Sequence, residues 1–247
     1  MDFININGLR LFAPRSREEV IQQAFEKKKI LVAVNAEKIL MTDNDFLQLM
    51  SSNIGYPDGF GAVALLKKYG FAQAIKIPGV ELWLDIIKRH HKDKSFYLIG
   101  AKEEVINKTV SGLKKEFNGI NIVGYRNGYM QADDVRALKN DIKNKKPDVI
   151  FVAMGSPRQE NLMKALQSIH PAVYLGLGGS FDVYTGKVKR APKWWIDNNL
   201  EWAFRLISQP KRIRRQIHLV KIIPLLFFGK VKYKENLNGK PKFVIVR

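Results

Sequence analysis

Apolar runs alternate with longer amphipathic stretches along most of this chain. The runs are rich in β-branched and aromatic residues and occupy residues 30–34, 96–99, 120–123, 149–154 and 172–177. A short, continuous apolar run is typical of a strand covered on both faces, which is the usual setting of a parallel sheet. Because these strands alternate with helical stretches, we expect an α/β fold: a Rossmann-like, mostly parallel sheet flanked by helices, with a basic helical C-terminal appendage.

The stretches between the apolar runs have helical periodicity. Predicted helices cover residues 16–28, 43–53, 61–69, 79–90, 102–117, 132–144 and the segment from Pro157 to about Gln167. Ser16 and Glu19 have the spacing of a capping box. Before them, Asn7-Gly8 predicts a hairpin turn between two short strands within residues 3–12.

Two segments of the chain end in polar residues that are candidates for ligand binding or catalysis. The run that begins at Val149 stops at Gly155, and Ser156-Pro157-Arg158-Gln159-Glu160 follows. Ser156 is expected to cap a helix there and Pro157 to begin it. Polar side chains at the carboxyl end of a parallel strand face the crevice where open α/β sheets bind ligands. The same pattern also fits an ordinary helix start, in which Glu160 merely favours the helix dipole.

A second polar feature is Asp58, within Gly55-Tyr56-Pro57-Asp58-Gly59. Proline and glycine on both sides of Asp58 predict a turn, and turn chemistry alone is a sufficient explanation of the Asp-Gly pair. Asn35 follows the run at residues 30–34 and is another polar residue at the end of a predicted strand.

Composition excludes several classes of protein. With 247 residues, of which 46% are hydrophobic, the chain is globular and can bury a large core. The absence of cysteine excludes disulfides, thiolate catalysis and cysteine-based metal sites. The N-terminus lacks the features of a secretory signal, and no uninterrupted apolar stretch reaches the roughly 18–20 residues of a membrane span. We therefore expect a cytoplasmic protein.

Charge is concentrated near the C-terminus. The formal net charge is +19, and residues 205–234 hold nine basic residues and no acidic one. Such a segment is expected to meet a polyanion, which could be nucleic acid, an anionic lipid surface or the phosphates of a substrate. Its apolar residues are Ile, Val, Leu and Phe, as in a membrane segment, and no recognised nucleic-acid motif occurs. The pattern therefore favours a membrane surface over nucleic acid.

The same region predicts helices at residues 197–207 and 211–223. In the second, Ile213, Ile217 and Val220 share one side, and the basic residues lie largely opposite. A basic amphipathic helix is typical of a segment that lies on a membrane without crossing it. The alternative is a helix that docks on the core with a solvated basic face. We divide the chain into a core of residues 1–198 and an appendage of residues 199–247.

Two further motifs resemble functional signatures only weakly. The segment from Gly176 to Phe181 resembles a dinucleotide fingerprint, but Phe181 replaces its third glycine, which argues against a nicotinamide site. A glycine-rich turn can still bring backbone N–H groups close to a phosphate or sugar. Asp43-Asn44-Asp45 has the Asp-x-Asp form used by metal-dependent sugar transferases, yet helix capping explains it better. We expect no metal and no cofactor.

Ordered motifs extend from about residue 30 to residue 225. They are Val34-Asn35-Ala36-Glu37-Lys38, Pro57-Asp58-Gly59, Gly79-x-x-Leu82-Trp83, Val152-Ala153-Met154-Gly155-Ser156-Pro157-Arg158-Gln159-Glu160, Gly178-Gly179-Ser180-Phe181-Asp182, Gly186-x-x-x-Arg190-Ala191-Pro192 and Leu200-Glu201-Trp202-x-x-Arg205-Leu206. With these motifs the chain resembles the WecG/TagA/CpsF family of bacterial glycosyltransferases. The family transfers an N-acetylmannosamine-type sugar from UDP to undecaprenyl-diphosphate-linked N-acetylglucosamine, with inversion.

The resemblance implies roles for particular residues. Asp58 takes the place of the general base, although an ordinary aspartate, with a pKa of about 4, is a weak base. The substrate-binding residues that it implies in the core are Asn35, Ser156, Gln159, Glu160, Gly178, Gly179 and Arg190. Arg205, Arg212 and Arg215 of the appendage would stabilise the departing diphosphate in place of a metal ion.

The resemblance also implies partners and a location. The partners are a UDP-sugar donor, an undecaprenyl-diphosphate-linked acceptor and an anionic membrane surface. The basic appendage would attach the enzyme peripherally to the inner face of the cytoplasmic membrane, where its acceptor resides. Whether the core forms homo-oligomers is left open.

One departure concerns the donor. The teichoic-acid branch of the family typically has Thr-Pro-Asn where this chain has Ala33-Val34-Asn35. The chain looks closer to the transferase that adds N-acetylmannosaminuronic acid during enterobacterial common antigen synthesis. The extra carboxylate of that donor could meet Arg158 or Lys38. The alternatives are UDP-N-acetylmannosamine or another UDP-hexose, a nucleic-acid-binding protein and a Rossmann oxidoreductase.

Overall fold

The computed structural model describes residues 1–246 except residues 7, 42, 199, 209–229 and 236–240. The chain divides into two compact units. Unit 1 comprises Met1–Val20, Ala33–Pro78 and Arg190–Arg247, and unit 2 comprises Ile21–Val32 and Gly79–Lys189. This division does not test the predicted boundary after residue 198, which stays a prediction.

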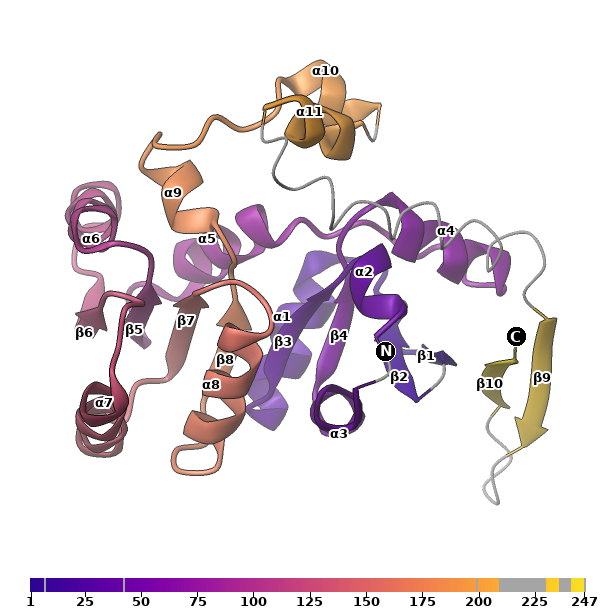
Figure 1. The fold of residues 1–247 in the computed structure, drawn as a ribbon, viewed down its shortest axis with the longest axis horizontal. Coiled ribbons are helices and arrows are strands. Elements are labelled where there is room, and N and C mark those ends of the chain that lie inside the picture. Colours follow the sequence, from indigo (N-terminus) through magenta and orange to yellow (C-terminus); the bar gives the residue numbers. More distant parts are fainter. Residues whose placement is uncertain (7, 42, 199, 209–229, 236–240, 247) are drawn as a thin grey trace. The chain divides into compact units, whose positions relative to one another are not determined.

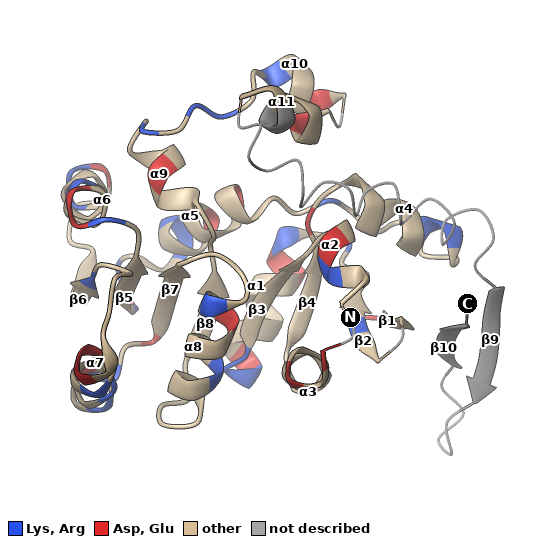
Figure 2. Cartoon of the chain, viewed as in Figure 1, with Lys and Arg blue, Asp and Glu red and all other residues tan. Residues whose placement is uncertain are grey.

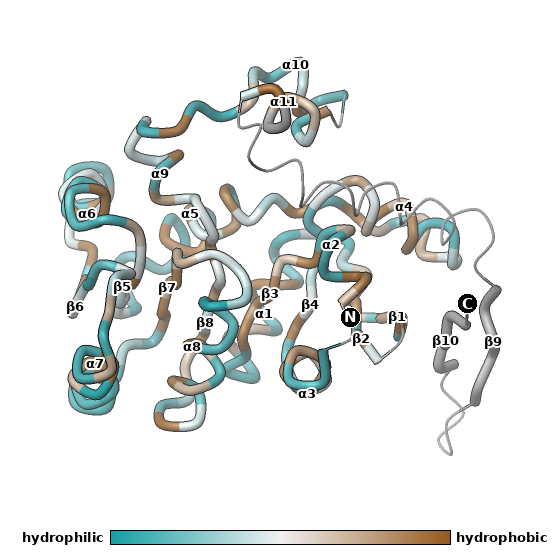
Figure 3. The backbone as a smooth tube through the Cα atoms, viewed as in Figure 1, coloured by the Kyte–Doolittle hydropathy of each residue, from teal (hydrophilic) through white to brown (hydrophobic). Residues whose placement is uncertain are grey.

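The larger sheet has six strands in the order β4-β3-β8-β7-β5-β6 (Figure 1). Their bounds are β3 (Ile30–Val34), β4 (Ile54–Pro57), β5 (Ser95–Gly100), β6 (Asn121–Arg126), β7 (Val149–Ala153) and β8 (Val173–Gly176). The sheet is parallel, with Val149 of β7 opposite Val173 of β8. Every residue of β7 is apolar (Figure 3), and every one is buried, as expected for a strand covered on both faces. The predicted α/β fold is confirmed.

The smaller sheet has the order β2-β1-β10-β9 and lies in unit 1. Its strands are β1 (Phe3–Ile6), β2 (Leu9–Phe12), β9 (Lys230–Glu235) and β10 (Pro241–Val246). The predicted N-terminal hairpin is confirmed: β1 and β2 are antiparallel, and Gly8 has a φ of +93°. Asn5 Oδ1 accepts a hydrogen bond from the Gly8 N–H at 2.9 Å, which stabilises the turn. The sequence analysis did not predict β9 and β10.

The helices predicted between residues 16 and 167 are present. The longer ones are α1 (Arg17–Lys27), α3 (Asn44–Ser52), α4 (Phe60–Lys68), α5 (Gly79–His90), α6 (Glu103–Glu116), α7 (Ala132–Lys145), α8 (Arg158–Gln167) and α11 (Glu201–Ser208). The shorter ones are α2 (Ala36–Ile39), α9 (Ser180–Tyr184) and α10 (Lys193–Asp197). The helix predicted at 197–207 corresponds to α11, which begins four residues later, and α10, which follows Pro192, was not predicted. The helix predicted at 211–223 lies outside the described residues.

Two local interpretations of the sequence are settled by the structure. Asp43 is the N-cap of α3, with its Oδ1 accepting a hydrogen bond from the Phe46 N–H at 2.9 Å, so the capping interpretation of Asp43-Asn44-Asp45 is confirmed. The turn predicted over Gly55-Tyr56-Pro57-Asp58-Gly59 is wrong for its first three residues, because they belong to β4. A Cβ at Gly55 would lie 2.7 Å from the Arg10 carbonyl oxygen, so only glycine permits this close strand packing.

An aromatic cluster forms part of the core of unit 2. Trp83 of α5 is fully buried, and its ring centroid lies 5.7 Å from Phe151, 5.5 Å from Phe181 and 5.4 Å from Tyr184. All three contacts are edge-to-face, which is a favoured geometry for aromatic pairs. The cluster joins α5, β7 and α9, and it gives the Gly-x-x-Leu-Trp motif a packing role.

Trp83→Ala is expected to destabilise the fold by about 3–5 kcal/mol, because it removes the largest buried side chain and leaves a cavity. Trp83→Phe keeps an aromatic ring and should lose less. Urea unfolding of both variants measures the effect. Equal stability of Trp83→Ala and the wild type would contradict the packing role.

Candidate functional site

Asn35 and Asp58 of unit 1 follow two strands of the larger sheet. Asn35 is the exposed residue after β3 and the N-cap of α2, with its Oδ1 accepting a hydrogen bond from the Lys38 N–H at 3.0 Å. Asp58 is the half-buried residue after β4. Its backbone N–H donates to the Val34 carbonyl at 2.9 Å, which places Asp58 beside the end of β3. The fold therefore brings Asn35 and Asp58 to neighbouring strand ends.

The start of α4 provides a favourable setting for the Asp58 carboxylate. Gly59 is the N-cap of this helix and has a φ of +104°, a conformation that glycine adopts without strain. Asp58 thus lies immediately before the positive end of the helix dipole, which favours a negative charge. A carboxylate in its ionised form is able to accept a proton.

Ser156 and Glu160 of unit 2 interact with each other across the first turn of α8. Pro157 is the N-cap of this helix, so the prediction that Ser156 caps it and Pro157 is its first residue is wrong. The Ser156 hydroxyl instead donates to Glu160 Oε1 at 2.7 Å. The hydroxyl is therefore hydrogen-bonded to a side chain of α8 and not to a backbone N–H at the start of the helix.

Gln159 links the segments that follow β7 and β8. Its Oε1 accepts hydrogen bonds from the Gly155 N–H at 3.2 Å and from the Gly178 N–H at 2.9 Å. Its Nε2 donates to Glu160 Oε1 at 3.1 Å. Gln159 and Glu160 are only 4% and 3% exposed. Four predicted residues of unit 2 therefore meet in one hydrogen-bonded cluster, namely Ser156, Gln159, Glu160 and Gly178.

The glycine-rich turn after β8 has open space in the directions in which side chains would project. A Cβ at Gly178 or Gly179 would meet no atom within 4 Å, and the same holds for Gly155 after β7. A phosphate or sugar could therefore approach this backbone closely. The Gly178 N–H, however, already donates to Gln159.

The predicted arginines are described to different extents. Arg190 is half-buried and lies in the basic segment that leads from α9 to α10 (Figure 2), and it belongs to unit 1. Arg205 lies on α11. Arg212 and Arg215 lie outside the described residues. Arg158 is exposed and donates to the Gly128 carbonyl at 3.4 Å, whereas Lys38 is only 6% exposed.

Sequence reasoning identified Gly176 only as the start of a glycine-rich motif and did not connect it, as the last residue of β8, with Gln159. A Cβ there would lie 2.6 Å from Gln159 Nε2, so the absence of a side chain makes room for the amide. The available signal was a glycine inside an apolar strand, which often marks a close approach of another group.

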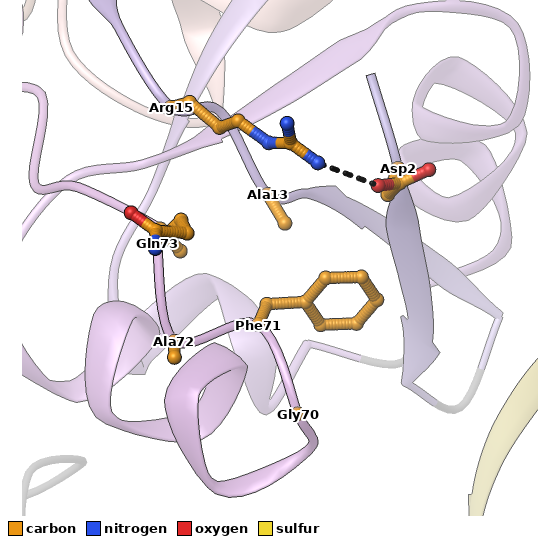
Figure 4. Close-up of a pocket in the computed structure, with 8 residues that line it drawn as sticks. Asp2, Ala13, Arg15, Gly70, Phe71, Ala72 and Gln73 are labelled. Carbon is orange, nitrogen blue, oxygen red and sulfur yellow. Dashed lines mark ion pairs between the residues drawn. The ribbon is translucent and has the colours of Figure 1, made fainter.

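A small pocket in unit 1 contains none of the predicted residues (Figure 4). Its volume is about 260 Å³, and its lining includes Arg15 and Asp2, whose charged groups are 4.0 Å apart. Within the described ranges, no three His, Asp or Glu side chains are grouped as a metal site requires. No helix among the same residues has the length and apolar character needed to cross a membrane.

Comparison with protein families matches residues 4–236 to the group described as "Glycosyl transferase WecG/TagA/CpsF family". The match includes all strands of the larger sheet and every predicted site residue. Strand β10 lies outside it.

Proposed function

Because the chain belongs to the WecG/TagA/CpsF family of glycosyltransferases, we propose that it transfers N-acetylmannosaminuronic acid from UDP to undecaprenyl-diphosphate-linked N-acetylglucosamine. The observation that carries this proposal is the family match over residues 4–236. The product would be an intermediate of a cell-surface polysaccharide.

The proposed reaction is a single displacement with inversion. The acceptor hydroxyl oxygen attacks the anomeric carbon on the face opposite UDP, and its proton passes to the Asp58 carboxylate. The bond between the anomeric carbon and the diphosphate oxygen breaks, and its electron pair leaves with UDP. The half-buried position of Asp58 and its place before α4, at the positive end of the helix dipole, support this role.

The core and the appendage both provide the other residues of the proposed site, which bind the sugar and stabilise the departing diphosphate. Asn35, after β3, and Gln159, after β7, are each proposed to bind the donor sugar. Arg190, Arg205, Arg212 and Arg215 neutralise the negative charge that develops on the departing diphosphate. Guanidinium groups suit this task because each offers several donors in a planar arrangement.

In this proposal, the appendage of residues 199–247, together with α10, also attaches the protein peripherally to the cytoplasmic membrane. Trp194 of α10 is 62% exposed, and Trp202 and Ile207 of α11 are 44% and 72% exposed. Tryptophan favours the membrane interface because its ring is apolar and its N–H is polar. Basic residues in the same region would add attraction to anionic lipids.

Arg158 is the residue we propose for the donor's carboxylate, since its side chain is exposed and Lys38 is buried. Arg158→Ala should raise the KM for UDP-N-acetylmannosaminuronic acid by about 10–100-fold, because a hydrogen bond to a charged group contributes about 1.5–3 kcal/mol. The KM for UDP-N-acetylmannosamine should change little. Transfer assays with both donors measure this difference.

Arg136→Ala is the matched control, because Arg136 is an exposed arginine of α7 that pairs with Asp133. It should leave both KM values unchanged. Wild-type transfer from UDP-N-acetylmannosamine but not from the uronate would support the alternative donor and contradict the assignment of Arg158.

A further inference from the structure

We propose that Glu160 and Gly176 are positioning residues that hold the Gln159 amide as a clamp between the segments following β7 and β8. The inference rests on the proposed use of a UDP-sugar donor. Glu160 and Gly176 act on the donor through Gln159. Glu160 determines which way the amide faces, and Gly176 provides the space in which it lies.

The orientation of the Gln159 amide follows from its neighbours. Two backbone N–H groups, of Gly155 and Gly178, point at one end of the amide, and only an oxygen can accept from them. Glu160 Oε1 lies 3.1 Å from the other end, where only the NH₂ group can donate. A flipped amide would place donor against donor at one end and oxygen against carboxylate at the other. Glu160 therefore selects the orientation that joins the two segments.

Glu160 is itself held in place. The Ser156 hydroxyl donates to the same Oε1 atom at 2.7 Å, and the carboxylate is only 3% exposed. Hydrogen bonds in a buried, water-poor setting are stronger than exposed ones, so the chain from Ser156 through Glu160 to Gln159 should be rigid.

Gly176 contributes by its lack of a side chain. A Cβ at this position would lie 2.6 Å from Gln159 Nε2, 3.0 Å from Met163 Cε and 3.1 Å from Gln159 Cδ. Gly176 ends β8 and does not have a left-handed φ, so its conformation does not require glycine. The requirement is spatial: alanine would displace the amide from the two N–H groups.

The clamp has a consequence for the donor. It fixes Gly178, whose outer face is open together with that of Gly179, and so presents a preformed backbone surface to the sugar nucleotide. Loss of the clamp should therefore weaken donor binding more than it slows the chemical step.

Gly176→Ala tests the clamp through a double-mutant cycle with Gln159→Ala. Each single variant should raise the KM for the UDP-sugar by about tenfold or more, because the hydrogen bonds to Gly155 and Gly178 are lost, and kcat should change by about twofold at most. The double variant should be no worse than Gln159→Ala, since no amide is left to displace. Additive effects, or an unchanged KM in Gly176→Ala, would overturn the proposal.

A second measurement does not depend on turnover. Amide hydrogen exchange of the full-length protein, followed by NMR, reports on the Gly178 N–H, with Leu177 as an internal control because its N–H donates to the Val152 carbonyl at 2.8 Å. In Glu160→Ala and Gly176→Ala, Gly178 should exchange about tenfold faster relative to Leu177 than in the wild type. Parallel changes at both amides would overturn the clamp. If the protection of the Gly178 N–H from exchange depends on Glu160 but the protein does not bind UDP, the clamp stands and the proposed function is contradicted.

Discussion

Asp58→Asn is expected to abolish sugar transfer while leaving UDP binding intact. The amide has nearly the same shape as the carboxylate but cannot take the proton of the acceptor hydroxyl. The backbone hydrogen bond from Asp58 to Val34 does not involve the side chain, so the strand end should be preserved. Because general base catalysis contributes about 10²–10⁴-fold, kcat should fall by at least the lower of these factors.

The assay compares initial rates of transfer with calorimetric titration of UDP. Asp45→Asn is a matched control, since Asp45 lies in the first turn of α3 in the same unit and has no assigned role. It should retain wild-type turnover, which would also argue against a metal at Asp43-Asn44-Asp45. Normal turnover by Asp58→Asn would remove Asp58 as the base.

Truncation after Asn198 is expected to remove transfer activity and membrane attachment together. The deleted residues carry α11 and the basic segment at 205–234, and they also carry β9 and β10 of the smaller sheet. Transfer should fail because the diphosphate loses Arg205, Arg212 and Arg215. Flotation with anionic liposomes and titration of UDP measure the two losses separately, and circular dichroism checks that the larger sheet persists.

Two sets of full-length variants distinguish arginines that bind the diphosphate from basic residues that only attract the membrane by their charge. Joint replacement of Arg205, Arg212 and Arg215 by alanine should weaken both UDP binding and flotation. Joint replacement of Lys211, Arg214 and Lys221 removes the same charge and should weaken flotation alone, by about 1 kcal/mol for each residue near the surface. Diphosphate binding that survives the truncation would contradict the assignment of the arginines.

Most of the larger sheet could be predicted from the sequence because its central strands are buried on both faces and are therefore continuously apolar. The strand β4 could not, since Gly55 and Pro57 are ordinarily turn residues. There, the close approach of the Arg10 carbonyl oxygen outweighs the local preference.

The positions of the candidate residues could be predicted in part. Asn35 and Gly155 follow apolar strands, so the sequence alone placed them at strand ends, whereas Asp58 was expected in a turn. The bonds that Gln159 makes to Gly155 and Gly178 depend on how β7 and β8 pair, which residue spacing does not reveal. Ser156 illustrates the limit, because its hydroxyl could meet either a backbone N–H or the carboxylate of Glu160.

The most direct test of the proposed activity is incubation of the purified full-length protein with lipid-linked N-acetylglucosamine and UDP-N-acetylmannosaminuronic acid. Mass spectrometry of the lipid product, together with NMR of its new glycosidic bond, gives both the added sugar and its anomeric configuration. We expect one uronate residue to be added, with a configuration opposite to that in the donor. Absence of transfer from UDP-N-acetylmannosaminuronic acid would contradict the proposed donor, and a product that retains the donor's configuration would contradict an inverting transfer with Asp58 as the base.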